Sequence, residues 1–203
     1  YYIGLRNNNQ ILLEDFQKRF ELVFGIKPII TNEGRCKVQN KEIYELLTKE
    51  FSYYSYEWQL PKLSKDNLKY WLRAFFDCEG WVENQIETYR RLIRAESCNE
   101  NGILAIQKAL KNFNINSYVK KRLNRTIWRL TICERKGIMN YHKKIGFLHP
   151  DKYAKLSKAI DSFKDYNWKI PDNEEELLSF IKLNGKIVEY RKQIRFSSIR
   201  KNN

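Results

Sequence analysis

Two carboxylates, with one residue between them, follow an unusually apolar segment of the chain. Asp77 and Glu79, with Gly80 behind them, come directly after residues 72–76, which read Leu-Arg-Ala-Phe-Phe. Apolar residues recur here every three or four positions, which predicts a helix with Ser64 as its N-cap and an apolar stripe of Leu68, Trp71, Leu72, Phe75 and Phe76. Acids are unfavourable at the C-terminal end of a helix, which carries partial negative charge. A divalent cation would compensate them, so Asp77 and Glu79 are candidate metal ligands.

The chain is strongly basic. Lys and Arg number 38 against 24 Asp and Glu, which gives a formal net charge of +14. Such a surplus favours a polyanionic partner, and nucleic acid is the first to consider. No apolar run approaches the roughly 20 residues that cross a bilayer, and no signal peptide precedes the first strand-like segment, so we expect a soluble, cytoplasmic protein with no membrane partner. Sequence motifs of P-loop NTPases, zincins and serine esterases are absent.

A predicted β-hairpin carries most of its charge on one face. The segments 118–123 and 127–132 flank a short polar loop and are typical of paired strands. Alternation along them separates an apolar face from a mainly cationic one, to which the neighbouring strand 89–95 adds two arginines. The cationic set is Arg90, Arg94, Lys120, Arg122 and Arg129. Any half-exposed sheet needs a polar face, but the scarcity of acids on these strands favours nucleic-acid binding.

Two parts of the sequence repeat one pattern. Residues 3–26 and 93–115 each read as a strand, a polar Asn-rich break and an amphipathic helix, and residues 34–51 resemble 127–147 in the same way. The copies lie about 90 residues apart, and the second has a preface that the first lacks. If the repeat is genuine, we expect a helix and a strand ahead of Tyr1.

The composition changes near the C-terminus. A helix with three glutamates in its first turn is predicted after Asp172, and a short basic helix follows it. A helix, a turn and a second basic helix resemble the opening of a helix-turn-helix module, although any small helical appendix would give the same pattern.

The segment Leu72–Gly80, LRAFFDCEG, resembles the LAGLIDADG motif of homing endonucleases. It matches at the leading Leu, at two bulky apolar positions, at the Asp, at the final acid and at the Gly. The flanking pattern also resembles this family, over roughly residues 1–160. The resemblance implies an α+β fold of αββαββα repeats with a saddle-shaped antiparallel sheet, of the two-repeat single-chain type, with the first motif absent. We divide the chain into a truncated first repeat (1–60), a second repeat (61–165) and the basic helical module (166–203).

The resemblance also implies roles for individual residues. The motif helix would pack against a second such helix through Leu72, Ala74, Phe75, Phe76 and Gly80. Glu79 would be the catalytic carboxylate that holds Mg²⁺. Asp77 would bond backbone amides or assist the metal, and Lys152 is the candidate for a basic catalytic residue. The saddle would lie in the major groove of double-stranded DNA, with contacts from Arg6, Arg35, Lys37, Arg90, Arg94, Lys120, Arg122 and Arg129.

Three functions are compatible with these features. The first is a homing endonuclease, from an intron, an intein or a free-standing gene, which recognises a DNA sequence and hydrolyses its phosphodiester backbone with Mg²⁺. It would act as a monomer with an internal pseudo-twofold axis if the first motif is present, and otherwise with a partner chain. The second keeps the fold without cleavage, as a DNA- or intron-RNA-binding maturase or regulator. The third is an unrelated basic ribosomal or RNA-binding protein, in which Leu68–Phe76 would pack under a sheet instead of against a twin helix.

Overall fold

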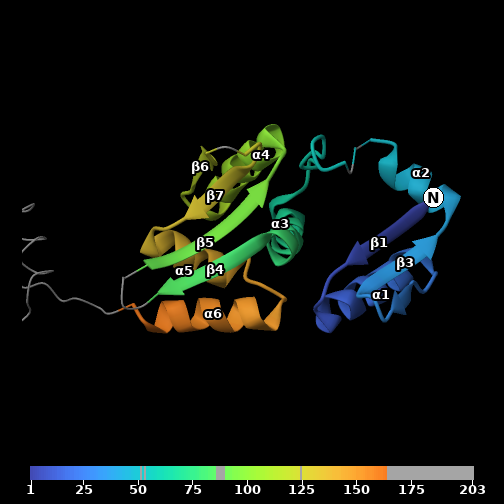
Figure 1. The fold of residues 1–203 in the computed structure, drawn as a ribbon, viewed down its shortest axis with the longest axis horizontal. Helices are drawn as coiled ribbons and strands as arrows, with labels where there is room; N and C mark the ends of the chain where they lie inside the picture. The colour runs from blue at the N-terminus through green and yellow to red at the C-terminus, as the bar shows by residue number, and fades with distance from the viewer. Residues whose placement is uncertain (51, 53, 86–89, 124, 164–203) are drawn as a thin grey trace, which may run out of the picture. The chain divides into compact units, whose positions relative to one another are not determined.

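A computed structural model describes residues 1–50, 52, 54–85, 90–123 and 125–163 (Figure 1). One compact unit spans Tyr1–Phe163. The basic helical module expected over residues 166–203 lies outside the described residues.

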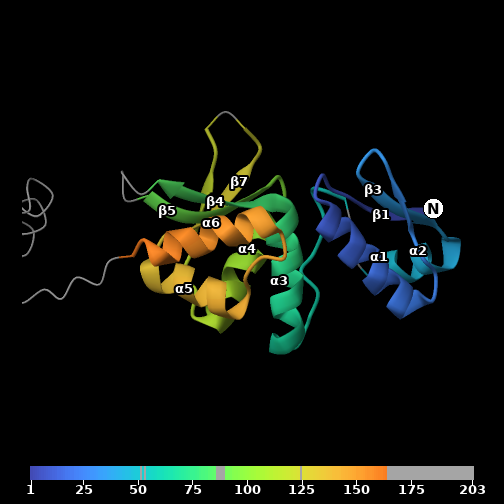
Figure 2. The same ribbon diagram turned by 90° about the horizontal axis from the view of Figure 1, so that it is seen from below.

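The first part of the unit is a three-stranded antiparallel sheet with two helices. Its elements are β1 (Tyr2–Arg6), α1 (Gln10–Phe24), β2 (Ile29–Thr31), β3 (Arg35–Gln39) and α2 (Lys41–Thr48), and the strand order is β1-β3-β2. Asparagines begin both helices, because the side chains of Asn9 and Asn40 accept backbone N–H groups of the first turns of α1 and α2. Both helices lie on one side of this sheet, so its other face is open (Figure 2).

The second part is a four-stranded antiparallel sheet with four helices. Its elements are α3 (Lys65–Glu79), β4 (Gly80–Gln85), β5 (Arg90–Ser97), α4 (Glu100–Leu110), a 3-10 turn (Lys111–Phe113), β6 (Tyr118–Lys121), β7 (Trp128–Ile132), α5 (Arg135–Lys144) and α6 (Pro150–Asp161). The strand order is β4-β5-β7-β6. Helices α4, α5 and α6 lie on one side of this sheet (Figure 2).

The two parts share one topology. The series β1, α1, β2, β3, α2 corresponds to β5, α4, β6, β7, α5, and the sheet orders β1-β3-β2 and β5-β7-β6 agree. Among the described residues, the first sheet has no counterpart of α3 or β4. The architecture is therefore the α+β repeat that the sequence predicts, with α6 following the second copy.

A single apolar core lies between the second sheet and its helices. It draws on α3, three strands, α4, α5 and α6, and its largest fully buried members are Tyr141, Phe76, Leu72, Ile93, Ile103, Ile106, Leu110, Ile115, Leu130, Ile132 and Ile138. Within the described ranges, no helix is long and apolar enough to cross a membrane.

The segment between α2 and α3, here called the linker, joins the two copies of the repeat and packs against the second copy. Trp58 packs against Trp71 and Phe75 of α3, with ring centroids 5.9 and 5.4 Å away. Its backbone carbonyl accepts the Nδ2–H of Asn99 at 2.6 Å, and its ring lies so close to Gly102 that a Cβ there would be 2.5 Å from it. The linker is thereby fixed to the start of α4 and to α3.

Candidate functional site

The apolar stripe of α3 divides into two groups. Ser64 caps the helix as predicted, with its Oγ accepting the N–H of Asn67 at 3.3 Å. Leu68, Leu72 and Phe76 are buried in the core of the second sheet. Trp71 and Phe75 are half-buried and pack with the linker. The helix is therefore held on two sides, which fixes where its last turn points.

Gly80 is required at the end of α3 by a close approach. A Cβ at this position would lie 2.7 Å from the carbonyl oxygen of Phe76 and 3.1 Å from that of Arg94. Both atoms belong to backbone, which cannot move aside cheaply. The chain can therefore turn directly from α3 into β4 and pair Gly80 with Ala95 only because residue 80 has no side chain.

Asp77 is a buried structural carboxylate. It is 3% exposed, and its Oδ1 accepts the backbone N–H groups of Leu148 at 3.1 Å and His149 at 3.0 Å. Burial raises the pKa of Asp77, while these two amides, Lys152 and Arg73 oppose the rise. The sequence assigned compensation of the acids at the helix end to a metal ion. For Asp77 the compensation comes from backbone amides, which is the first of the two roles that the resemblance implied for this residue.

Lys152 caps the C-terminal end of α3. Its Nζ donates to the carbonyl oxygens of Phe76 at 3.2 Å and Asp77 at 2.5 Å. A cation is favourable at this end of a helix, where carbonyls lack intrahelical partners. Burial lowers the pKa of Lys152, and the neighbouring Asp77, Cys78 and Glu79 raise it. Lys152 therefore lies in the same electrostatic site as the two acids.

Glu79 is the exposed acid of the motif. Among the described residues, no group hydrogen-bonds its carboxylate. Partial desolvation raises the pKa of Glu79, and the charge of Lys152 lowers it. An accessible carboxylate with one neighbouring cation remains available to a ligand.

The side chains at this site fit a metal ion only in part. The described residues contain no group of three or more His, Cys, Asp or Glu side chains that could hold one. Asp77 does not fit as a ligand because Oδ1 and Oδ2 both accept N–H groups. Glu79 fits as a single carboxylate ligand, which is how Mg²⁺ is often bound when substrate phosphates and water complete its shell.

One face of α3 is not covered by its own core. Ala74 and Cys78 are exposed and, with Tyr70, border a cavity of about 1080 Å³. The opposite wall includes Phe16, Phe20 and Val23 of α1. Of the residues predicted to pack against a second motif helix, Ala74 lies on this cavity, whereas Leu72, Phe76 and Gly80 are buried within their own copy and Phe75 packs against the linker.

Arg73 lies on the same turn and is held by contacts on two sides. Its Nε donates to the carbonyl oxygen of Ile145 at 2.7 Å, and its guanidinium lies over the ring of Tyr70.

The open face of the second sheet carries the predicted cations. Pairing places Trp81 opposite Arg94, Glu96 opposite Arg129, and Lys120 also opposite Arg129, so these side chains project from the same face. The separation of an apolar and a cationic face along the hairpin is as predicted.

Two glutamates lie on this face outside the segments whose scarcity of acids the sequence showed: Glu83 is on β4, and Glu96 follows residues 89–95 directly in β5. Glu83 pairs with Arg94 and with Arg90, the latter at 3.1 Å between Oε2 and Nε. Glu96 pairs with Arg129 at 2.7 Å and with Arg122 at 3.3 Å. Four of the five predicted cations of this sheet are therefore already in ion pairs.

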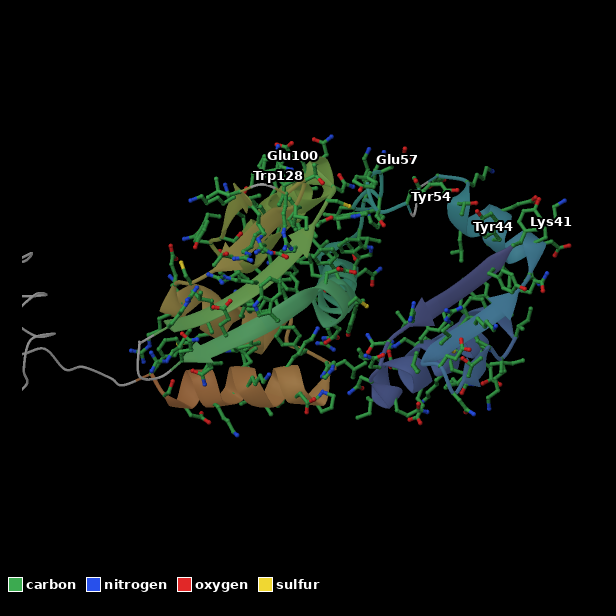
Figure 3. The ribbon with its side chains drawn as sticks, in the orientation of Figure 1. Lys41, Tyr44, Tyr54, Glu57, Glu100 and Trp128 are labelled. Atoms are coloured by element: carbon green, nitrogen blue, oxygen red, sulfur yellow. The ribbon has the colours of Figure 1, made fainter. Side chains whose placement is uncertain are left out.

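The first sheet presents Arg6, Arg35 and Lys37 on its open face. In the register of β1 on β3, Arg6 lies opposite Arg35 and Gly4 lies opposite Lys37, and all four positions are exposed. Arg35 lies 3.7 Å from Glu33, and both side chains are largely exposed. Beyond this sheet, Lys41 and Tyr44 of α2 lie beside the N-terminal Tyr1 (Figure 3).

Topology and motif both resemble a LAGLIDADG-type domain. Residues 66–146 match the family described as a LAGLIDADG-like domain, and this match confirms the resemblance of Leu72–Gly80. The third functional interpretation, a basic protein unrelated to this family, is therefore wrong, although Leu68, Leu72 and Phe76 do pack under a sheet.

Solved structures support the same fold. Full-length DUF199/WhiA from Thermatoga maritima aligns with a TM-score of 0.55 at 16% identity, over 90% of this chain and 58% of that one. Mesophilic variants of the homing endonuclease I-DmoI align with a TM-score of 0.50 at 13% identity, over 71% of this chain and 78% of theirs. At these identities, the likeness concerns the fold alone.

A curated relative is the isomerizing glutamine–fructose-6-phosphate aminotransferase of Methanocaldococcus jannaschii, which is 25% identical over 206 residues. The match covers 88% of this chain and 18% of that protein, so the chain spans less than a fifth of the relative's length.

Sequence reasoning missed several residues that shape the site. Glu83 and Glu96 lie on the cationic face, and their positions opposite or diagonal to arginines become evident only once strand register is known. The amides of Leu148 and His149 carry no signal in the sequence, because any residue type supplies a backbone N–H.

Proposed function

We propose that the protein binds double-stranded DNA through the open faces of its two sheets and hydrolyses the phosphodiester backbone at Glu79 with Mg²⁺. The observation that carries this proposal is the contrast between the two acids of the motif. Asp77 is buried and hydrogen-bonded, whereas Glu79 is exposed at the end of the same helix turn, beside Lys152.

Glu79, Lys152 and Asp77 would each have a separate role in this reaction. Bound Mg²⁺ would activate water and offset charge in the transition state. Glu79 would hold the metal, and Lys152 would keep Glu79 ionised by lowering its pKa while it fixes the end of α3 through two carbonyls. Asp77 would fix the same helix end from the other side, through the amides of Leu148 and His149.

A complete site of this kind calls for a second acid-bearing helix. We propose that such a helix, from the same polypeptide or from a partner chain, packs against the face of α3 that carries Ala74. Ala74 is small and exposed, and it borders the cavity described above, which supports a close approach of another backbone there.

A plasmid library with random inserts tests the proposal. Wild-type protein with Mg²⁺ should nick or linearise a subset of the plasmids, and EDTA should prevent this. Glu79→Gln should slow cleavage by about 10²- to 10³-fold while DNA binding persists. Glu100→Gln, at the exposed start of α4 (Figure 3), makes the same chemical change outside the site and should cleave as wild type does.

The second candidate function is binding without cleavage, to DNA or to intron RNA. It is favoured by one observation, which is that Glu79 is the single carboxylate of the motif available to a metal among the described residues. DNA binding by the wild type and by Glu79→Gln, with no cleavage by either, would establish this function and exclude the enzymatic one. Duplex RNA of matched length, added as a competitor, should bind more weakly than DNA, and tighter binding would assign the surface to RNA.

A further inference from the structure

The open face of the second sheet carries a connected network of ionised and aromatic side chains. One centre is Glu83, which pairs with Arg94 and Arg90 and accepts the Nε1–H of Trp81 at 3.1 Å. The other centre is Glu96, with Arg129 and Arg122. The guanidinium of Arg129 lies 5.6 Å from the ring centroid of Trp81, so the aromatic ring joins the two centres.

The geometry of this network constrains the arginines. Arg129 directs both Nε and a terminal nitrogen to Oε1 of Glu96 at 2.7 Å. The Arg94 side chain is only 11% exposed, and the two glutamate side chains are each 22% exposed. Isolated surface ion pairs contribute little, but a network of several partly buried charges fixes its members in place.

The first sheet provides a contrast within the same chain. Its one ion pair among the described residues, Arg35 with Glu33, is longer at 3.7 Å, and the side chains are 47% and 76% exposed. Arg35 is therefore loosely held, whereas four cations of the second sheet are held by acids that reduce the positive field of the face.

Acids are unfavourable on a surface that binds phosphate, so their presence on this face needs a physical reason. An arginine without a partner binds any phosphate oxygen, which adds affinity for every sequence alike. An arginine held by a carboxylate is less attractive to phosphate, and it presents its remaining N–H groups in a fixed direction, as recognition of the guanine O6 and N7 atoms requires.

We propose that Glu83 and Glu96 are specificity-determining residues, which neutralise and orient the arginines of the second sheet so that this face discriminates between base sequences instead of binding DNA through charge alone. This inference rests on the proposed DNA-binding function. It treats the two glutamates as positioning residues, because they act through the arginines they hold. Specificity is a difference of affinities, and lowering the affinity for wrong sequences raises it as effectively as adding contacts to the right one.

The experiment compares binding to two probes, a random-sequence duplex pool and the pool that the wild-type protein enriches from it over repeated selection. Glu96→Gln should bind the random pool about tenfold more tightly. Its log–log salt dependence on that pool should steepen by about 0.9 to 1.8, the change expected for one or two further phosphate contacts. Its preference for the selected pool should fall about tenfold. Glu83→Gln should show the same changes in affinity for the random pool, in salt dependence and in preference for the selected pool.

Two further variants separate charge from position. Glu96→Asp keeps the charge but withdraws the carboxylate from Arg129, so it should reduce the preference without steepening the salt dependence. Glu21→Gln removes one negative charge from the exposed surface of α1, and it should change neither quantity. Circular dichroism and thermal unfolding establish that each variant is folded. Where a Gln variant is unfolded, the Asp variant at the same position decides.

The outcomes distinguish this inference from the proposed function. If the wild type binds neither pool, the DNA-binding function is wrong, and the inference falls with it. If the wild type enriches a sequence but the Glu83 and Glu96 variants keep its preference, or lose affinity equally for both pools, DNA binding stands and the role given to the two glutamates is wrong.

Discussion

The backbone N–H of His149 donates to Oδ1 of Asp77 at 3.0 Å, across 72 positions of sequence. The same oxygen accepts the N–H of Leu148 at 3.1 Å. One atom of one carboxylate therefore fastens the end of α3 to the loop that leads into α6. This arrangement gives Asp77 a structural task that is separate from that of Glu79, although the two acids are two residues apart.

Replacing Asp77 by Ala should destabilise the protein, whereas replacing it by Asn should be far milder. Ala leaves two amides in a buried region without acceptors, at a cost of about 2–4 kcal/mol in the free energy of unfolding. Asn keeps an Oδ1 that can accept both amides. Urea unfolding of the two variants measures the difference, with Asp66→Asn at the exposed start of α3 as a control. Equal losses for Ala and Asn would show that the amide bonds are not what Asp77 contributes.

Glu79→Gln should raise the thermal stability at neutral pH while it slows the proposed cleavage. The pKa of Glu79 is raised in the folded protein, chiefly by desolvation, so its ionised form is disfavoured there relative to the unfolded chain. The destabilisation is complete above the folded-state pKa and vanishes below the ordinary pKa of a glutamate. The gain in melting temperature should therefore shrink as the pH falls through that interval. Calorimetric scans across this range measure it, and a gain that persists in acid would contradict the assignment.

The sequence predicted the local elements well because their signals are local. The Ser64 cap depends on contacts within four residues, and the hairpin on a turn and an alternation. The repeat followed from the order of elements, which the strand orders β1-β3-β2 and β5-β7-β6 reproduce.

The hydrogen-bond and ion-pair partners of each acid could not be predicted, because these partners lie far away in the chain. Asp77 meets amides about seventy residues downstream, and Lys152 reaches the carbonyls of α3 from the first turn of α6. Glu96 faces Arg129 only in one register of β5 on β7, and a shift by one residue would turn it to the other face. Patterns of residue type carry no information on such pairings.

Gly102→Ala should loosen the linker that joins the two copies. A Cβ at residue 102 would lie 2.5 to 2.7 Å from the outer ring carbons of Trp58. The indole must then move away from α4, and we expect a loss of about 1–3 kcal/mol in the free energy of unfolding, which is typical of overpacking. Thermal unfolding followed by circular dichroism measures it.

A second substitution tests the cause of that loss. Trp58→Phe removes the ring carbons that a Cβ at residue 102 would strike, so it should cost less in the Gly102→Ala background than in the wild type. A double-mutant cycle gives the coupling energy between residues 58 and 102. Purely additive losses would show that the two residues do not meet as described.

Arg91→Met should detach the end of α6 from the second sheet. Arg91 lies on the covered face of β5, where its Nε donates to Oγ of Ser162 at 2.6 Å and a terminal nitrogen donates to the carbonyl oxygen of the same residue at 3.0 Å. Its guanidinium also lies 5.2 Å from the ring centroid of Phe163. Met keeps the apolar stem of the side chain and removes these interactions. Hydrogen bonds to charged groups contribute about 1.5–3 kcal/mol, so a loss of that size is expected.

The neighbouring Arg90 provides the matched control, because it projects from the opposite, open face and its side chain is 47% exposed. Arg90→Met should change the stability by less than about 0.5 kcal/mol. Hydrogen exchange adds a local measurement, in which Arg91→Met should accelerate exchange in the last turn of α6 and leave α4 protected. If both arginine variants lose the same stability, or if exchange accelerates throughout the core, then Arg91 does not act as a local clamp on α6.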